Sequence, residues 1–189
     1  DIADISFANN GDVVVAGHNE SVNIWNGSRW EQHTIHTEMG KIDSDSLFDL
    51  VFACFRNVWT AAKGDDGTVW VGTYGKGLLR MSPDGTTFVV WDTSNSSLAT
   101  SVSGENYVVV SRLRVDPAGN MWAACYVSAD NKPLKVWTAD EMDDPYGAFA
   151  FSYPDQIPST GIHDIDCSWD RVAVATDNGA SVIVHNGTI

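Results

Sequence analysis

Basic side chains are scarce in this chain. Its 189 residues include 11 Lys and Arg against 25 Asp and Glu, so the formal net charge at pH 7 is −14. A nucleic-acid backbone is bound through clustered Lys and Arg side chains, which displace its counterions. The charge balance therefore argues against nucleic acid as a partner, and the dispersed acidic residues indicate solvated loops.

Cysteine and long apolar runs are scarce as well. The three cysteines form no C-x-x-C pair and are too few for a disulfide scaffold, so we expect buried free thiols. No apolar run approaches the roughly 20 residues of a membrane helix, which argues against direct membrane insertion. No signal peptide opens the chain, and Asp1 already lies in a strand-like repeat. We interpret the chain as a piece of a larger protein.

What the chain does contain is one motif in four copies. The copy at residues 65–72, DDGTVWVG, reads as a tight turn followed by a strand, and three more such strands begin at Asp12, Asn120 and Arg171. Equivalent positions in the four copies lie 56, 52 and 51 residues apart, at Val13, Val69, Met121 and Val172. A period near fifty residues, made of short strands and turns, is typical of propeller blades.

Each copy predicts strands in meander order. The strand before the turn lies at residues 2–7, 58–62, 110–115 and 162–167, and we expect it to be innermost. The strand after the Gly-rich link lies at 21–25, 78–81, 134–137 and 181–184, and a fourth strand lies at 29–34, 87–92 and 148–153. Such a sheet cannot bury both faces alone, and neighbouring copies stacked around an axis cover it. The expected fold is all-β: a β-propeller of about four four-stranded blades, at 1–47, 48–106, 107–160 and, incompletely, 161–189.

The last copy of the repeat bears on how many blades the whole propeller has. The fourth copy stops at Thr188-Ile189, where its outermost strand is due. Propellers run from about four to eight blades, so a segment of a larger propeller is favoured over a closed four-bladed ring. The strand runs VVVA, VWVG, MWAA and VAVA are apolar on both faces, as in sheets covered from both sides. Trp70 and Trp122 occupy equivalent positions, and we expect both to be buried between blades.

Three segments interrupt the repeat. Residues 40–57 contain an apolar run at 47–55 that predicts either an extra strand or a short helix. Residues 94–106 are rich in Ser, Asn and Thr and predict a surface loop. Residues 139–147 interrupt the third copy, with a helical turn at 139–142 that the Asp144-Pro145 pair would end.

The repeat resembles the two-component-regulator propeller repeats, a bacterial family. Residues 65–73, DDGTVWVGT, with GKGL at 75–78 match its pattern closely, and DPAGNMW at 116–122 matches well, whereas the first and fourth copies lack the strand tryptophan. Such blades occur in periplasmic glycan sensors of hybrid two-component systems and in PorZ-like surface components of the type IX secretion system. The NSSL link at 95–98 is common to both, and NKPLKVW at 131–137 looks more like the PorZ-like proteins. The resemblance implies an exported bacterial protein of the periplasm or outer cell surface.

No catalytic signature is present. Residues 74–77, YGKG, have the composition of a phosphate-binding loop, but a strand follows where such a loop requires a helix. His33 and His36 stand at the end of a strand, where a spacing of three directs the rings to opposite faces, and no third ligand is suitably spaced. The Asp-Gly turns are explained by turn geometry. We therefore expect no metal site, no cofactor and no requirement for metal in folding.

His163, Asp164 and Asp166 lie on the innermost strand of the fourth copy and have the chemistry of acid and base catalysis. Strand alternation places His163 on the face opposite both carboxylates, so the strand itself sets up no pair. Among the aromatic residues, Trp169, Tyr74 and Tyr126 are better placed than the strand tryptophans for exposed contacts.

These features favour a non-enzymatic binding or docking module over the alternative, a propeller enzyme that hydrolyses or cleaves glycans at a channel-centred site. An enzyme requires acid, base or metal groups that converge on the channel, whereas a docking module requires a surface patch. Links between second and third strands share one rim with the connections that enter the innermost strands, and recognition residues concentrate on such loops. We predict that this rim binds a protein partner or a polysaccharide, unless its members are ordinary turn residues; they are His18, Asn19, Tyr74, Lys76, Tyr126, Asn131, Lys132, His163, Asp177 and Asn178.

Overall fold

The computed structural model describes residues 1–18, 20–185 and 189, and Asn19 of the predicted rim lies outside the described residues. The first antiparallel sheet, blade 1, consists of β1 (Ile2–Phe7), β2 (Val13–Gly17), β3 (Ser21–Trp25) and β4 (Trp30–Thr34). Its strands follow one another in sequence order, as a meander does. Asn9-Asn10-Gly11 joins the first two strands, with Gly11 at a φ of 88° that suits glycine.

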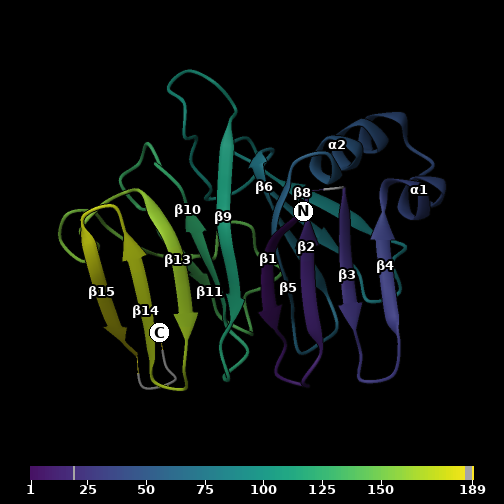
Figure 1. The fold of residues 1–189 in the computed structure, drawn as a ribbon. Helices are drawn as coiled ribbons and strands as arrows, with labels where there is room; N and C mark the ends of the chain where they lie inside the picture. Colours follow the sequence, from purple (N-terminus) through teal and green to yellow (C-terminus); the bar gives the residue numbers. More distant parts are fainter. Residues whose placement is uncertain (19, 186–188) are drawn as a thin grey trace.

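The same unit recurs along the chain (Figure 1). Blade 2 consists of β5 (Val58–Lys63), β6 (Val69–Gly75), β7 (Leu78–Met81) and β8 (Phe88–Trp91). Blade 3 consists of β9 (Val108–Val115), β10 (Met121–Cys125), β11 (Leu134–Trp137) and β12 (Phe149–Phe151). Blade 4 consists, in the described residues, of β13 (Ile162–Cys167), β14 (Arg171–Thr176) and β15 (Gly179–Val184).

The first strand of each blade lies at the centre of the arrangement. β1 packs beside β5, β5 beside β9 and β9 beside β13, and all four run in the same direction (Figure 1). Blades 2 and 3 are also joined directly, because the top of β6 pairs with β9 at Tyr74↔Val109 and Gly75↔Val108. The predicted innermost strands and the meander order are confirmed.

Three hydrophobic clusters hold the blades together, one at each contact between neighbours. Val14 faces the first cluster, between blades 1 and 2; Trp70 faces the second; and Trp122 faces the third, between blades 3 and 4. All three side chains are fully buried and occupy equivalent positions in β2, β6 and β10. The predicted burial of Trp70 and Trp122 is confirmed.

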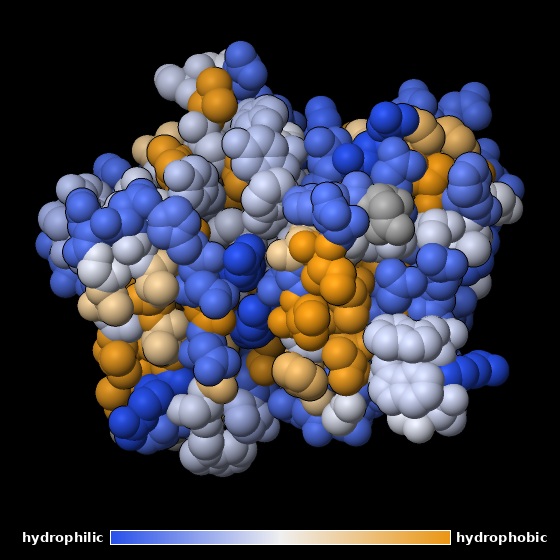
Figure 2. Space-filling view, in the orientation of Figure 1, coloured by the Kyte–Doolittle hydropathy of each residue, from blue (hydrophilic) through white to orange (hydrophobic). Residues whose placement is uncertain are grey.

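The expectation that all four central runs are covered on both faces is wrong for the two end blades. β6 and β10 are buried on both faces, whereas β2 and β14 alternate between buried and more exposed residues. The reason is that blades 1 and 4 each have only one neighbour. Figure 2 shows the result: two apolar areas, over blade 1 and over blade 4, separated by a hydrophilic strip.

Helices occur only in the connection between blades 1 and 2, within the described residues. They are α1 (Ile35–Glu38), the 3-10 helix η1 (Met39–Lys41) and α2 (Asp45–Phe55). The run at 47–55, open between strand and helix in the sequence, is helical and buries Val51, Cys54 and Phe55 against the first cluster. His36 lies in α1, so its predicted place on a strand is wrong. The segment at 139–142, where a helical turn was possible, forms hydrogen-bonded turns and no helix.

Glu38 makes the stability of the protein depend on pH. Its carboxylate is buried, 3.0 Å from His33 Nδ1 and 2.8 Å from Lys41 Nζ. Burial opposes ionisation, but the hydrogen bonds from His33 and Lys41 outweigh it and hold the pKa of Glu38 below its usual 4.5. The stabilisation is therefore complete above pH 4.5 and is lost as the pH falls through the lowered pKa.

We expect Glu38→Gln to lower the free energy of unfolding near neutral pH by about 1–3 kcal/mol, because a buried charged hydrogen-bond acceptor is lost. The same variant should lose stability less steeply than the wild type below pH 4.5. Urea denaturation at a series of pH values measures both effects, with exposed Glu105→Gln as the control. Parallel pH profiles for Glu38→Gln and the wild type would contradict the assignment.

Candidate ligand-binding site

A β-bulge occurs at the same place in every blade. The register between first and second strands shifts at Ile2/Asp4, Val58/Thr60 and Ile162/Asp164, and in blade 3 it shifts where Val110 and Arg112 meet Cys125 and Ala124. In each blade one residue of the first strand has no partner in the second strand. It is Ala3 in blade 1, Trp59 in blade 2, Ser111 in blade 3 and His163 in blade 4. A bulge re-aims the side chain of its extra residue. These four side chains therefore lie at the end of the inner strands where the chain enters each blade.

A residue at the end of each second strand stands beside the bulge. His18, Tyr74, Tyr126 and Asp177 occupy this position, and their backbone N–H groups donate to Asp1 O, Asn57 O, Val109 O and Gly161 O at 2.9–3.1 Å. Across two of the blade contacts, between blades 1 and 2 and between blades 3 and 4, rings of the two kinds of residue meet. The ring of His18 is 4.9 Å from that of Trp59, and the ring of Tyr126 is 6.1 Å from that of His163.

Between blades 2, 3 and 4 several of these residues line an open cavity of about 330 Å³. Its lining is aromatic on several sides, with polar groups from β9 and β13, and consists of Trp59, Tyr74, Val109, Ser111, Arg112, Tyr126, Ile162 and His163. Trp59 and Tyr74 are 5.1 Å apart between ring centroids, and Tyr74 is 43% exposed. We call this cavity the rim site.

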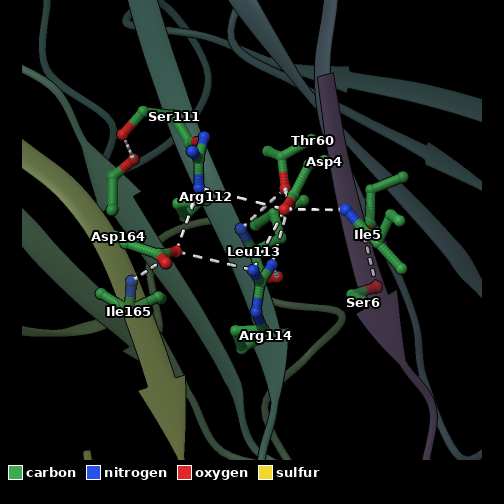
Figure 3. Close-up of polar contacts among 12 residues, drawn as sticks. Asp4, Ile5, Ser6, Thr60, Ser111, Arg112, Leu113, Arg114, Asp164 and Ile165 are labelled. Atoms are coloured by element: carbon green, nitrogen blue, oxygen red, sulfur yellow. Dashed lines mark hydrogen bonds and ion pairs between the residues drawn. The ribbon is translucent and has the colours of Figure 1, made fainter. Parts of the chain in front are cut away.

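Below the rim site, charged and polar side chains on the inner strands form a network across all four blades (Figure 3). Arg114 holds Asp4 of β1 through two bonds of 2.8 and 3.1 Å, and Arg112 Nε donates to Asp164 of β13 at 3.1 Å. Thr60 Oγ1 donates to Asp4 at 2.5 Å and accepts from Leu113 N at 3.0 Å. The network fixes the guanidinium of Arg112 at the floor of the rim site.

The structure brings together half of the predicted rim residues. His18, Tyr74, Tyr126, His163 and Asp177 lie at or beside the rim site, and His163 Nε2 is hydrogen-bonded to Asp177 Oδ1. The carboxylate beside His163 therefore comes from the link after β14, not from its own strand. Tyr74 is exposed as predicted, and Tyr126 is partly buried.

The other predicted residues lie elsewhere. Lys76 lines a separate groove beside α2, with Leu50, Cys54 and Asp92. Asn131 and Lys132 are exposed in the connection from β10 to β11, and Asn178 is exposed in the turn before β15. Trp169 is 63% exposed, in the turn after β13 at the opposite end of the inner strands. Sequence reasoning missed Trp59, Ser111 and Arg112.

The groups at the rim site bear on two kinds of catalysis, by a serine nucleophile and by a bound metal ion. Ser111 Oγ donates to backbone oxygens of Ala124 and Ile162, and no bond in the described part of the chain joins it to His163. It is therefore not arranged as a nucleophile. The described residues contain no cluster of three His, Cys, Asp or Glu side chains placed to hold a metal ion. Folding without metal stays a prediction.

Solved structures with the same arrangement of sheets define the fold. The WD40 β-propeller domain of Doa1 superposes with a TM-score of 0.52 over 96% of this chain and 50% of that chain, at 13% identity. The chain has a β-propeller fold. At this identity the likeness extends to the fold alone.

Two bacterial propellers are also similar. The extracellular domain of a protein from B. thetaiotaomicron, described as a one component system, has a TM-score of 0.56 at 17% identity, covering 96% of this chain and 21% of that chain. PorZ, a surface component of the type-IX secretion system of Porphyromonas gingivalis, has a TM-score of 0.54 at 15% identity, covering 97% and 32%. The propeller thus spans between a fifth and a third of those two chains. These are the kinds of protein that the repeat resembles.

No protein-family model and no curated protein matches the sequence. Among the described residues, no helix of the propeller has the length and apolar character needed to cross a membrane.

Proposed function

We propose that the chain is a non-enzymatic binding module of an exported bacterial protein and that its ligand occupies the rim site. The observation that carries this proposal is the rim site itself, where Trp59, Tyr74 and Tyr126 line the same cavity as Arg112. Aromatic faces stack on sugar rings or apolar side chains, and a guanidinium pairs with carboxylates. This combination suits an anionic polysaccharide, or an acidic segment of a protein partner. The location outside the cytoplasm rests on the extracellular domains among its structural neighbours.

Titration with soluble polysaccharides tests this function. The probes are a neutral glucan and a uronate-containing polysaccharide, and the readout is tryptophan fluorescence, to which Trp59 contributes. We expect saturable binding of the uronate polymer, weakened about 10-fold or more by Tyr74→Ala or Tyr126→Ala. Stacking of a base on an aromatic side chain contributes about 1–3 kcal/mol, and we take stacking of a sugar ring to be of the same order.

Tyr146→Ala is the matched control, since Tyr146 is 62% exposed in the connection from β11 to β12 and is not among the residues that line the rim site. Equal binding by wild type, Tyr74→Ala and Tyr126→Ala at unchanged stability would mean that the ligand does not bind at the rim site. Absence of binding to both polymers would leave the protein-partner form of the proposal, and capture of an acidic peptide with the same variant pattern would support it.

One observation favours the second candidate, a glycan lyase. His163 is oriented by Asp177 and shares a cavity with Arg112, which are groups of the kind that remove a proton beside a neutralised carboxylate. Such an enzyme would release unsaturated products from the uronate polymer, visible by ultraviolet absorbance. Product formation that His163→Ala abolishes without loss of binding would establish the enzyme over the binding module.

A further inference from the structure

The charged side chains that line the rim site each have an acidic partner. Arg112 Nε donates to Asp164 Oδ1 at 3.1 Å, and His163 Nε2 is hydrogen-bonded to Asp177 Oδ1. The other lining residues are aromatic, apolar or, at Ser111, neutral and polar. The rim site is therefore polar and aromatic, but it is not a basic patch.

The charge balance extends below the rim site. Arg114 holds Asp4 through hydrogen bonds of 2.8 and 3.1 Å, and its Nη2 is also 3.6 Å from Asp164 Oδ1. The guanidiniums of the inner strands are thus matched by carboxylates, and the whole chain has a net charge of −14. Lys76 and Lys132 do not line the rim site. An anion of high charge density gains no general attraction from such surroundings.

Arg112 nevertheless keeps one directed donor for a ligand. Its Nε is used by Asp164, and its Nη1 donates to Ser111 O at 2.6 Å. Its Nη2 makes no hydrogen bond within the described residues. In Figure 3 the Nη end of this side chain points away from Asp164 and toward the bulge at Ser111. The side chain is 22% exposed, so a carboxylate oxygen in the rim site can accept from Nη2 without displacing Asp164.

We propose that the rim site selects a carboxylate on a sugar chain and rejects sulfated sugars, because it recognises the anion through one guanidinium edge and not through net positive charge. This inference rests on the proposed function, whose ligand it narrows. Asp164 is the positioning residue: it holds Arg112 by accepting from Nε, and its negative charge lowers the attraction of the site for anions in general. Stacking on the aromatic rings supplies the rest of the affinity.

Isothermal titration calorimetry with three probes tests this selectivity: a galacturonate trimer, its methyl ester and sulfated maltotriose. The ester keeps the sugar rings but loses the charge, so it should bind about 10-fold more weakly than the trimer. Sulfated maltotriose should also bind about 10-fold more weakly, or less. An increase in NaCl from about 50 to about 500 mM should change the dissociation constant of the trimer by less than about threefold, because a paired, partly buried contact is screened little.

Variants of Asp164 test its positioning role. Asp164→Asn keeps an oxygen for Arg112 Nε and removes the charge, so the trimer should bind about 5-fold more tightly and sulfated maltotriose should gain more than the trimer. Asp164→Ala also removes the acceptor, so the trimer should bind to it about 5-fold more weakly than to Asp164→Asn, because Arg112 is no longer held.

Asp166→Asn is the matched control. Asp166 lies two residues further along β13, and its carboxylate also accepts from the next backbone N–H, but it pairs with no basic side chain of the described chain. This variant should bind all three probes as the wild type does. Urea denaturation of each variant checks that its folding is unchanged.

Several results would overturn the inference. Sulfated maltotriose that binds as tightly as the trimer, with a steep loss of affinity in salt, would mean that the site acts as a basic patch. Equal binding of the trimer by Asp164→Asn and Asp164→Ala would remove the positioning role. Absence of trimer binding would overturn the inference while the protein-partner form of the proposed function stands. If Tyr74→Ala and Tyr126→Ala bind the trimer as the wild type does, the rim site is not the ligand site and the proposed function itself is wrong.

Discussion

Replacing Trp122 with alanine is expected to lower the free energy of unfolding by about 3–5 kcal/mol, the cost of removing a buried aromatic residue from a core. The ring is fully buried between blades 3 and 4, stacked at 5.6 Å on Phe151. Its Nε1 also donates to Asp116 Oδ2 at 2.9 Å. Both the packing and this hydrogen bond are lost in the variant, and urea denaturation followed by circular dichroism measures the sum.

Trp70 separates the two contributions. It is equally buried, between blades 2 and 3, but its Nε1 has no hydrogen-bond partner among the described residues. Trp70→Ala should therefore also cost about 3–5 kcal/mol, whereas Trp70→Phe should cost less than Trp122→Phe. A cost under about 1 kcal/mol for either alanine variant would remove the basis for reading these rings as inter-blade core.

The second large effect is expected at Asp116, in the turn between β9 and β10. Its carboxylate is fully buried and accepts four hydrogen bonds of 2.9–3.0 Å, from Ala118 N, Asn120 N, Asn120 Nδ2 and Trp122 Nε1. Asp116→Ala leaves these donors without their acceptor, and each buried unsatisfied donor costs about 1–3 kcal/mol. With partial relaxation we expect a loss of about 3–5 kcal/mol in the free energy of unfolding.

Asp66 provides the control. Its carboxylate accepts from Thr68 N and Thr68 Oγ1 in the equivalent turn of blade 2, but the residue is exposed, so water can replace the lost acceptor. Asp66→Ala should cost only about 0.5–1.5 kcal/mol. Equal stability of the two alanine variants would show that burial of the Asp116 carboxylate adds little to the stability of the fold.

The sequence predicted the strands of this fold well because turns mark them. Each Asp-Gly or Asn-Gly turn pins the register of two strands, and the apolar runs on either side of the turn have the length of strands. The secondary structure of the segment at 47–55 could not be predicted, since its apolar run suits either a strand or a helix. Its helical form depends on Val51, Cys54 and Phe55 meeting a cluster built from blades 1 and 2, which no local pattern records.

The rim site was predicted only in part. The repeat itself predicts Tyr74 and Tyr126, because each is the first residue after the second strand expected from the sequence. Trp59 and Ser111 were missed because strict alternation assigns them to a sheet face, and the bulge that re-aims them is a feature of strand pairing. A signal was present: counted back from each turn, Trp59, Ser111 and His163 occupy one equivalent position, and that position also holds Ala3.

The bulge has a consequence for how such a protein can change. An alanine, a tryptophan, a serine and a histidine occupy the same bulged position in the four blades, and all four inner strands keep the same pairing. A residue outside the ladder can be exchanged without disturbing the hydrogen bonds on either side of it. In blades 2, 3 and 4 this position also lines the cavity that we propose as the ligand site. A lineage could acquire a new specificity by single substitutions there, with little cost to folding.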